Sequence, residues 1–316
     1  MKLFEHKEFE QAILRAEQHF RTRGLRAAII EKDYYVTEAL RLVASAAKGN
    51  VIFKGGTSLS KGWNLIERFS EDVDIFLNPD ELSARAIDRE LKRIRDVVAK
   101  HPGLVLVPGE GQTIGGFGRN DRFSYKQRFD AAGGIANKVL LEIGTASGNQ
   151  PVETRELRSY LAEFLSDTGQ SLGAEDEASF AMPLLHFRRT FVEKMFAIHD
   201  KVELLKREKR PLGSYARHYY DLSRLAVTKE VQAMLNSAEY AAIKADYDRI
   251  SKEYFAKNYR PPEGLSFANS DALFPGEDLS AALGKEYDAQ CRVLCYAAYP
   301  NWGDVQSMFA GLRGRL

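Results

Sequence analysis

Apolar residues recur every three or four positions near the start of the chain. Ile13 and Phe20 lie on one side of a helix drawn over residues 5–23, and the same spacing continues over residues 29–47. Gly24 separates the two ranges and favours a break between them. The pattern therefore predicts two amphipathic helices in succession.

The pattern changes to that of strands over residues 51–77. A short apolar run opens this stretch, a pair of glycines interrupts it, and polar and apolar residues alternate at its end. The predicted elements are, in order, a buried strand at Val51–Phe53, a turn at Gly55 and Gly56, a helix with Thr57 and Ser58 at its N-cap, and a second strand at Asp72–Leu77.

Strand patterns continue to about residue 143, and helical spacing dominates beyond residue 152. We expect a helix at 81–100 and strands at 104–107, 122–129 and 136–143. The helices expected later in the chain cover 154–166, 188–206, 214–226, 229–237, 238–257 and 277–297. A stretch rich in Gly, Ser, Asn and Pro at 145–152 separates the halves, so the sequence predicts domains at 1–148 and 149–316.

Composition and charge are those of an ordinary globular protein. Hydrophobic residues make up 44% of the 316 residues and charged residues 28%, with a formal net charge of +1. Such a balance does not indicate a nucleic-acid binder over the whole surface, so any RNA contact would depend on local patches. No apolar run is long enough to span a membrane and the first residues lack the apolar core of a signal peptide, so we expect a cytoplasmic protein with no membrane partner.

The glycine turn predicts a site for phosphate oxygens. A strand that turns through Gly55 and Gly56 into a helix exposes backbone N–H groups, with the hydroxyl groups of Thr57 and Ser58 close by. These four residues are therefore the candidate nucleotide-binding residues. An ordinary strand–helix turn is the alternative, because a pair of glycines alone does not separate the two interpretations.

Carboxylates follow the turn on the next strand. Asp72 and Asp74 are two residues apart, so their side chains project to the same side while Val73 faces the core. Neighbouring carboxylates repel each other unless a cation lies between them, and Mg²⁺ bridges carboxylates to phosphates. The turn and the acids together predict a site for a metal-bound nucleoside triphosphate, and an exposed acidic strand edge is the alternative. Glu142, in an otherwise apolar strand, needs a partner of its own.

These motifs resemble those of a known group of enzymes. Two glycines, a Ser or Thr, a helix and then two aspartates on the next strand are the signature of the polymerase-β-like nucleotidyltransferase superfamily. The longer strings EKDYYVT (Glu31–Thr37), FKGGTSLSKGW (Phe53–Trp63) and RFSEDVDIFL (Arg68–Leu77) are similar to those of the AbiEii/AbiGii toxin family, which includes MenT-like toxins. The resemblance implies an α+β fold with a polymerase-β-like core, in which helices accompany a mixed sheet, and a mainly α-helical C-terminal domain.

Two later strings extend the resemblance. Lys194 lies in a string similar to the family's EK-x-x-A motif, and Asp221 lies in RHYYDL, which is similar to a later family motif. The resemblance implies that Lys194 contacts the triphosphate, that Asp221 orients or deprotonates the nucleophile, and that Glu142 is a third metal ligand. Without the family, Lys194 is a surface lysine, Asp221 is the partner of a nearby arginine, and Glu142 belongs to an ion pair at the sheet edge.

The resemblance also implies a function. A toxin of this kind transfers a nucleotide from an NTP to RNA, with the 3′ end of a tRNA as the expected acceptor, and thereby blocks translation. It uses Mg²⁺, or Mn²⁺ in its place, and is encoded with a cognate antitoxin, often in phage defence. Phosphorylation of Ser70 would add negative charge beside the acids and is one route by which the toxin could be silenced.

Several alternatives stay open from the sequence. An NTP-binding module without transfer would share the glycine turn but would not need both aspartates, and an antibiotic-modifying nucleotidyltransferase would share the whole motif. The stretch Glu31–Tyr34 is either a solvated helix face or part of the family pattern. The basic clusters Arg188–Arg189 and Lys206–Arg210 are either RNA contacts or solvated helix ends.

Overall fold

The computed structural model describes residues 1–47, 49–70, 72–80, 82–130 and 136–316. The chain folds into two compact units. Unit 1 holds Met1–Asn64 and Phe69–Leu185, and unit 2 holds Leu65–Arg68 and His186–Leu316. The short segment Leu65–Arg68 is thus part of unit 2, although the residues on both sides of it belong to unit 1.

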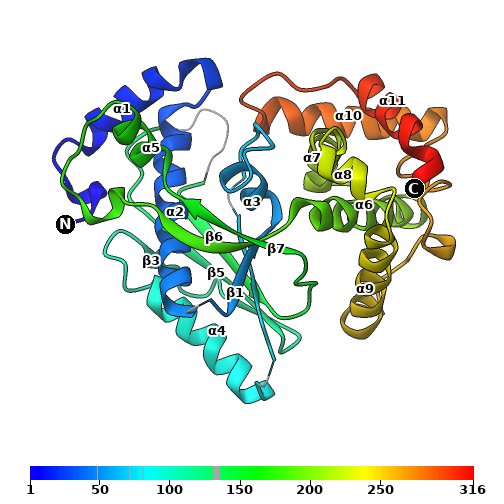
Figure 1. Ribbon diagram of the computed structural model, residues 1–316, viewed down its shortest axis with the longest axis horizontal. Helices are drawn as coiled ribbons and strands as arrows, with labels where there is room; N and C mark the ends of the chain where they lie inside the picture. Colours follow the sequence, from blue (N-terminus) through cyan, green and yellow to red (C-terminus); the bar gives the residue numbers. More distant parts are fainter. Residues whose placement is uncertain (48, 71, 81, 131–135) are drawn as a thin grey trace. The chain divides into compact units, whose positions relative to one another are not determined.

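Unit 1 is built on a mixed sheet. Its strands among the described residues are β1 (Val51–Lys54), β2 (Asp72–Leu77), β3 (Val105–Leu106), β4 (Gln112–Ile114), β5 (Gly118–Ser124), β6 (Lys138–Gly144), β7 (Val152–Leu157) and β8 (Phe180–Leu185). They lie in the order β3-β5-β6-β2-β1-β8-β7, and β4 pairs with β5 outside this row (Figure 1). The pairs β2–β6 and β1–β8 are parallel, whereas the other pairs are antiparallel.

Alternating burial explains why the central segments form strands. Val51 and Phe53 of β1 are buried while the residues between and after them are half-buried. The same alternation occurs around Val73 in β2 and Leu141 in β6. Apolar side chains on one face of these strands thus form the core, and the other face is left for polar residues.

The helices of unit 1 pack on this sheet and on one another. They are α1 (Phe9–His19), α2 (Ala27–Ala47), α3 (Gly55–Lys61), α4 (Ala84–Val98) and α5 (Tyr160–Asp167), with the 3-10 turns η1 (Leu3–Glu5), η2 (Arg21–Arg23) and η3 (Glu175–Glu177). α2 contacts β1, β2, β6 and β8 as well as α1, α4 and α5 (Figure 1). Most residues of α2 are buried, so this helix is the centre of the unit's core.

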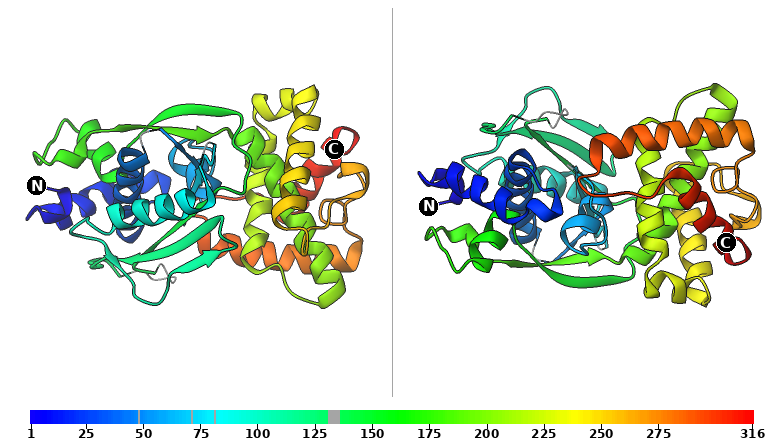
Figure 2. Two further views of the ribbon diagram at one scale, coloured as in Figure 1. Left: turned by 90° about the horizontal axis from the view of Figure 1, so that it is seen from below. Right: turned by 90° about the horizontal axis from the view of Figure 1, so that it is seen from above.

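Unit 2, all of whose residues are described, consists of helices and loops. Its helices are α6 (Phe187–Glu208), α7 (Arg217–Ala226), α8 (Lys229–Met234), α9 (Ala238–Tyr254), α10 (Glu277–Leu294) and α11 (Trp302–Leu312), with η4 (Gly213–Ala216), η5 (Glu263–Leu265) and η6 (Arg313–Arg315). α6 packs against α7, α8 and α9, and α7 also packs against α10 and α11 (Figure 2, green to red). Across both units, the described helices include none that is long and apolar enough to cross a membrane.

The expected α+β class, with a mixed sheet and a helical C-terminal part, is confirmed. The division between the parts lies at Leu185 and not at residue 148, because β7 and β8 extend the sheet of unit 1. The helix expected at 154–166 is wrong in its first half, where β7 lies, and α5 supplies only the second half. The two N-terminal helices are confirmed as α1 and α2.

Candidate active site

The two predicted aspartates lie on one face of β2. Asp72 and Asp74 are half-buried, whereas Val73 between them is fully buried. Asp74 stands in register with Lys54 of β1 and with Glu142 of β6. Residues in register on neighbouring strands point to the same side of a sheet, so Lys54, Asp74 and Glu142 form a row of charged side chains across three strands. We refer to these three residues as the charged row.

The glycine turn lies directly against the charged row. A Cβ atom on Gly55 would stand 1.9 Å from Oδ2 and 2.7 Å from Cγ of Asp74. The φ angle of Gly55 is +75°, a conformation in which a side chain is strained. Only glycine therefore lets the turn approach the carboxylate this closely, and the contact between turn and acid that a nucleotide site needs is present.

Thr57 and Ser58 lie inside the first turn of α3 and not at its cap. The helix begins at Gly55 with Lys54 as its N-cap, and both hydroxyl residues are buried. Thr57 Oγ1 donates to the carbonyl oxygen of Asp72 at 2.6 Å, and Ser58 Oγ donates to that of Gly55 at 2.9 Å. The predicted N-cap is therefore wrong, because these hydroxyl groups do not cap the helix. They form hydrogen bonds to the backbone of β2 and of the turn itself.

Glu142 is the acid that β6 contributes to the charged row. Its Oε1 accepts a hydrogen bond from Asn120 Nδ2 at 2.6 Å, and its carboxyl group is also hydrogen-bonded to Asp74. Burial, together with the negative charges of Asp74 and Asp72, raises the pKa of Glu142 to about 7, and Lys54 acts in the opposite direction. The crowded carboxylates therefore destabilise one another's charge, and a cation among them would relieve this repulsion.

The carboxylates fit a divalent ion that is shared with a substrate. Within the ranges that the structure describes, no group of three or more His, Cys, Asp or Glu side chains has the arrangement of a complete metal shell. Magnesium in phosphate-handling sites usually takes only one or two carboxylates, and water and phosphate oxygens complete its shell. Asp72 and Asp74 supply such a pair of oxygen donors, and the raised pKa of Glu142 marks the anionic crowding that an ion would offset.

Charged residues of α2 fasten the elements that carry this site. Asp33 Oδ1 lies 2.7 Å from Nζ of Lys61 in the last turn of α3. Lys32 Nζ donates to the carbonyl oxygen of Lys138, the first residue of β6. Glu31 and Lys32 are fully buried, so the solvated-face interpretation of this stretch is wrong. These residues position both the glycine turn and the strand of Glu142.

Glu31 binds the backbone of Arg128 and Phe129. Its carboxylate accepts hydrogen bonds at 3.0–3.1 Å from the backbone N–H groups of Arg128 and Phe129. Lys32 Nζ donates to the carbonyl oxygen of Ala136 at 2.6 Å. Burial raises the pKa of Glu31, and the two N–H groups oppose that shift. The motif Glu31–Thr37 on α2 thus has a structural role, in which Glu31 and Lys32 bind the backbone of other segments. The sequence alone did not indicate this role.

Within unit 2, the structure brings Lys194 and Asp221 together. Lys194 Nζ of α6 lies 2.7 Å from Asp221 Oδ2 of α7 and 3.1 Å from His218 Nδ1. Asp221 is completely buried, and Lys194 is 6% exposed. The surface-lysine interpretation of Lys194 is therefore wrong.

Asp221 is also held by Arg68, a residue that sequence reasoning missed. Arg68 Nε donates to Oδ1 at 2.6 Å and its Nη2 donates to Oδ2 at 2.7 Å, so the guanidinium binds both oxygens. Burial alone would raise the pKa of Asp221, but Arg68 and Lys194 hold it well below its usual value. A buried carboxylate with so low a pKa is a poor general base, so the geometry favours an orienting role for Asp221 over deprotonation of a nucleophile.

His218 stays neutral beside these charges. Burial and the neighbouring Lys194 lower the pKa of His218 to about 3. A lysine ammonium group can only donate, so Nδ1 of His218 accepts from Lys194 and the imidazole proton is on Nε2. Asp221 and His218 together use two of the three ammonium hydrogens of Lys194. Two cations against one anion give the three groups of Arg68, Lys194 and Asp221 a net positive charge.

Arg68 and Asn120 had weak signals in the sequence. Arg68 belongs to the string that precedes Asp72, but its partner Asp221 is 153 positions away. Asn120 meets Glu142 only through the register of β5 against β6. Contacts of this kind depend on the fold and not on local spacing.

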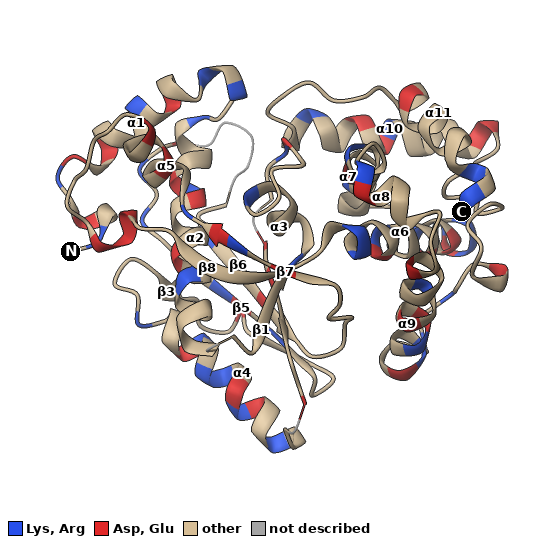
Figure 3. Ribbon diagram, in the orientation of Figure 1, with Lys and Arg blue, Asp and Glu red and all other residues tan. Residues whose placement is uncertain are grey.

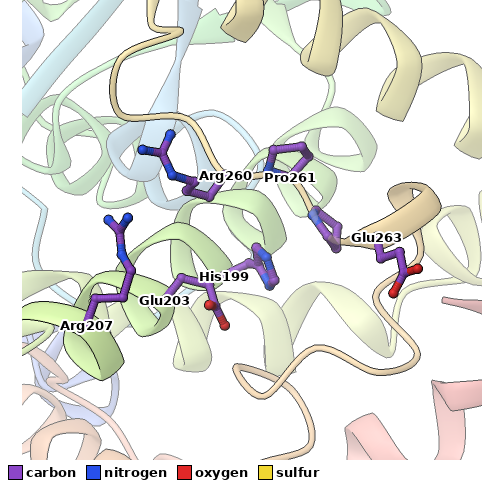
Figure 4. A pocket seen from close by; sticks show the side chains of 7 residues that line it. His199, Glu203, Arg207, Arg260, Pro261 and Glu263 are labelled. Atoms are coloured by element: carbon purple, nitrogen blue, oxygen red, sulfur yellow. The ribbon is translucent and has the colours of Figure 1, made fainter.

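A pocket of about 350 Å³ in unit 2 lies apart from the predicted residues. Figure 4 shows its walls, which come from α6 and from the segment before η5, lined by His199, Glu203, Arg207, Arg260, Pro261, Pro262 and Glu263. His199 is hydrogen-bonded to Ser270, and Glu203 accepts a hydrogen bond from Lys206. No predicted site residue lines this pocket, so we do not assign it to the active site.

The basic clusters of unit 2 are largely neutralised by acids. The ion pairs are Arg188–Glu239, Arg189–Glu193, Arg189–Asp246, Lys206–Glu203, Lys206–Asp271, Arg207–Glu208 and Arg210–Glu208. Paired guanidinium and ammonium groups have less to offer a phosphate. The structure therefore favours the solvated-face interpretation of these clusters over RNA contact.

Comparison with known proteins gives a match to a family and to a solved structure. A family profile described as "Nucleotidyl transferase AbiEii toxin, Type IV TA system" matches residues 39–291, from within α2 to within α10. Among solved structures, MenT4, a nucleotidyltransferase toxin from Mycobacterium tuberculosis H37Rv, is similar with a TM-score of 0.48 and 15% identity, over 91% of this chain and 89% of that chain. No curated protein sequence matches the chain.

Proposed function

The chain belongs to the AbiEii family of nucleotidyltransferase toxins of type IV toxin–antitoxin systems, and on that premise we propose that it transfers a nucleotide from an NTP to the 3′ end of a tRNA and so blocks translation. The close approach of Gly55 to the Asp74 carboxylate is the observation that carries the proposal. It joins the first turn of a helix, where backbone N–H groups lack intrahelical acceptors, to the acids that a nucleotidyl transfer needs. A pure binding module would not need that juxtaposition.

In this proposal the residues of unit 1 hold the nucleotide. The backbone N–H groups of Gly55 and Gly56 bind phosphate oxygens, while Thr57 and Ser58 keep the turn in shape through their own hydrogen bonds. Asp72 and Asp74, with Glu142 beside them, hold the divalent metal. That ion, Mg²⁺ or Mn²⁺, would supply neutralisation of the phosphate charge when bound.

The proposed role of unit 2 is to present a positive charge to the triphosphate. Lys194 is the proposed phosphate ligand, because one of its ammonium hydrogens is left over by Asp221 and His218. Asp221 orients Lys194 and is itself fixed by Arg68. Lys194→Ala should therefore raise the KM for the NTP more than it lowers kcat, which steady-state kinetics can separate.

Membership of a type IV toxin–antitoxin family implies an antitoxin partner. We expect production of the chain alone to arrest bacterial growth through loss of chargeable tRNA, and co-production of the antitoxin to restore growth. Recovery of growth with Asp74→Asn in place of the antitoxin would link the arrest to the site of unit 1.

The test of the proposed function is incubation of the protein with bulk tRNA, Mg²⁺ and each labelled NTP in turn. We expect label at the tRNA 3′ end with the wild type, none with Asp74→Asn, and undiminished label with Asp80→Asn, which changes an exposed acid after β2. Nucleotide binding without any transfer would instead indicate a binding module. Label that enters an aminoglycoside but not tRNA would indicate an antibiotic-modifying enzyme.

A further inference from the structure

The exposed side of α4 carries two arginines, Arg85 and Arg89. Figure 3 shows basic and acidic residues mixed along this helix. The acids of α4 form ion pairs with three other basic residues of the same helix. The pairs are Lys92–Asp88, Arg93–Glu90 and Arg95–Asp96. Arg85 and Arg89 form no ion pair with any acid in the described part of the chain. The positive charge of α4 is thus concentrated at its first turns.

Arg85 and Arg89 line an open hollow of about 680 Å³. Its other described lining residues are Ser83, Ala84, Asp88 and Gly116. The two arginines are one helical turn apart, so they project from the same side of α4 with Cβ atoms about 5–6 Å from each other. Gly116, between β4 and β5, has nothing within 4 Å of where its Cβ would be, so the hollow is open on that side.

The arginines in the lining of this hollow fit phosphate, and the one acid of the described lining, Asp88, is paired with Lys92. Its described residues include no aromatic or large apolar side chain. A nucleobase needs a stacking partner, and a protein partner usually needs an apolar or aromatic anchor. A guanidinium group, by contrast, binds phosphate oxygens through paired N–H donors and needs no apolar contact.

We propose that this hollow, named here the α4 hollow, binds the phosphodiester backbone of the RNA acceptor, an inference that rests on the proposed function. The net charge of +1 means that RNA affinity has to come from a local excess of positive charge. Most basic residues of the clusters in unit 2 have acidic partners, Lys209 being the exception, whereas Arg85 and Arg89 have none in the described part of the chain. Two unpaired arginines on one side of a helix can contact two phosphates of one strand.

The first test measures the affinity of labelled bulk tRNA over a series of KCl concentrations. Arg85→Gln/Arg89→Gln should weaken binding and reduce the slope of log Kd against log salt by about 1.4–1.8, at about 0.7–0.9 for each lost phosphate contact. The matched control, Arg93→Gln/Arg95→Gln, removes the same charge from the same helix but from paired residues. It should leave the slope unchanged.

A second pair of variants adds charge instead of removing it. Gly116 has a φ of +77°, which Asn and Asp tolerate better than other residues, and its Cβ position is open. Gly116→Asp should weaken tRNA binding by placing a carboxylate at the α4 hollow, and the isosteric Gly116→Asn should bind as the wild type does. The comparison isolates charge from shape.

The outcomes separate this inference from the proposed function. If the wild type labels tRNA and Arg85→Gln/Arg89→Gln keeps the wild-type affinity and salt slope, the α4 hollow is not the RNA site although the proposed function stands. The same holds if the arginine variants lose affinity for an antitoxin or for NTP while tRNA binding is unchanged. If the wild type neither binds nor labels tRNA, both are wrong.

Discussion

Replacement of Gly55 by alanine should separate the stability of unit 1 from its chemistry. The new Cβ would stand 1.9 Å from Oδ2 of Asp74, where an ordinary contact is 3.4 Å or more. The carboxylate would have to retreat by about 1.5 Å, the difference between these values. Gly109→Ala is the matched control, because Gly109 has a φ of +77° against +75° for Gly55 but nothing within 4 Å of its Cβ position.

The magnitudes follow from these two features. A left-handed φ costs an alanine about 1–2 kcal/mol, so both variants should lose that much stability, or about 2–8 °C in Tm. Only Gly55→Ala also displaces Asp74, the proposed metal ligand, and a misplacement of about 1 Å can cost about 100-fold in rate. Because the clash with Asp74 adds to the strain, we expect Gly55→Ala to have a Tm no higher than that of Gly109→Ala and a rate of nucleotidyl transfer about 100-fold lower.

The assay is Mg²⁺-dependent transfer of labelled NTP to tRNA, measured beside the thermal unfolding of each variant. Full activity of Gly55→Ala at a Tm equal to that of Gly109→Ala would refute the argument, because the position of the Asp74 carboxylate would then not matter for transfer. Equal loss of activity in both variants would assign the effect to backbone strain in general.

Two further predictions concern unit 2. Arg68→Met removes the bidentate partner of buried Asp221 and should lower the free energy of unfolding by about 3–5 kcal/mol. Its control, Arg93→Met, breaks an exposed pair with Glu90 and should lower it by at most about 1 kcal/mol. Urea unfolding measures both losses, and equal losses would contradict the first expectation. The pKa of His218 is about 3 in the folded protein, whereas its ordinary value is 6.5. At pH values between these two, the unfolded chain therefore binds a proton at His218 that the folded protein does not. Stability from this group is complete above pH 6.5 and falls on acidification by up to about 1.4 kcal/mol per pH unit. His218→Asn should therefore lose less stability between pH 7 and pH 5 than the wild type, and parallel pH profiles would contradict the assignment.

The central part of the fold was predictable because its signals are local. The apolar run of β1, the glycines and the alternation of β2 each depend on neighbouring residues. β7 was taken for a helix because its exposed and half-buried residues, VETREL, show no regular alternation at the edge of the sheet. β8 was missed because Pro183 interrupts a short apolar run that carries no turn signal.

Among the candidate site residues, too, those with local sequence signals were predictable, whereas contacts between distant segments were not. Gly55, Asp72 and Asp74 follow from spacing within one stretch, and the structure places Gly55 against Asp74. The partners that hold the second set of residues lie far away in the chain, as Arg68 does from Asp221. The burial of a lysine or an aspartate cannot be inferred from helical spacing when the compensating charge comes from another segment.

The most direct measurement of the central claim is calorimetric titration of a non-hydrolysable NTP into the protein with and without Mg²⁺. The charged row and the Gly55 turn predict binding that depends on Mg²⁺, and Asp74→Asn should weaken it at least tenfold while Asp80→Asn leaves it unchanged. Binding of the same strength without Mg²⁺, or in the folded Asp74→Asn variant, would contradict the account.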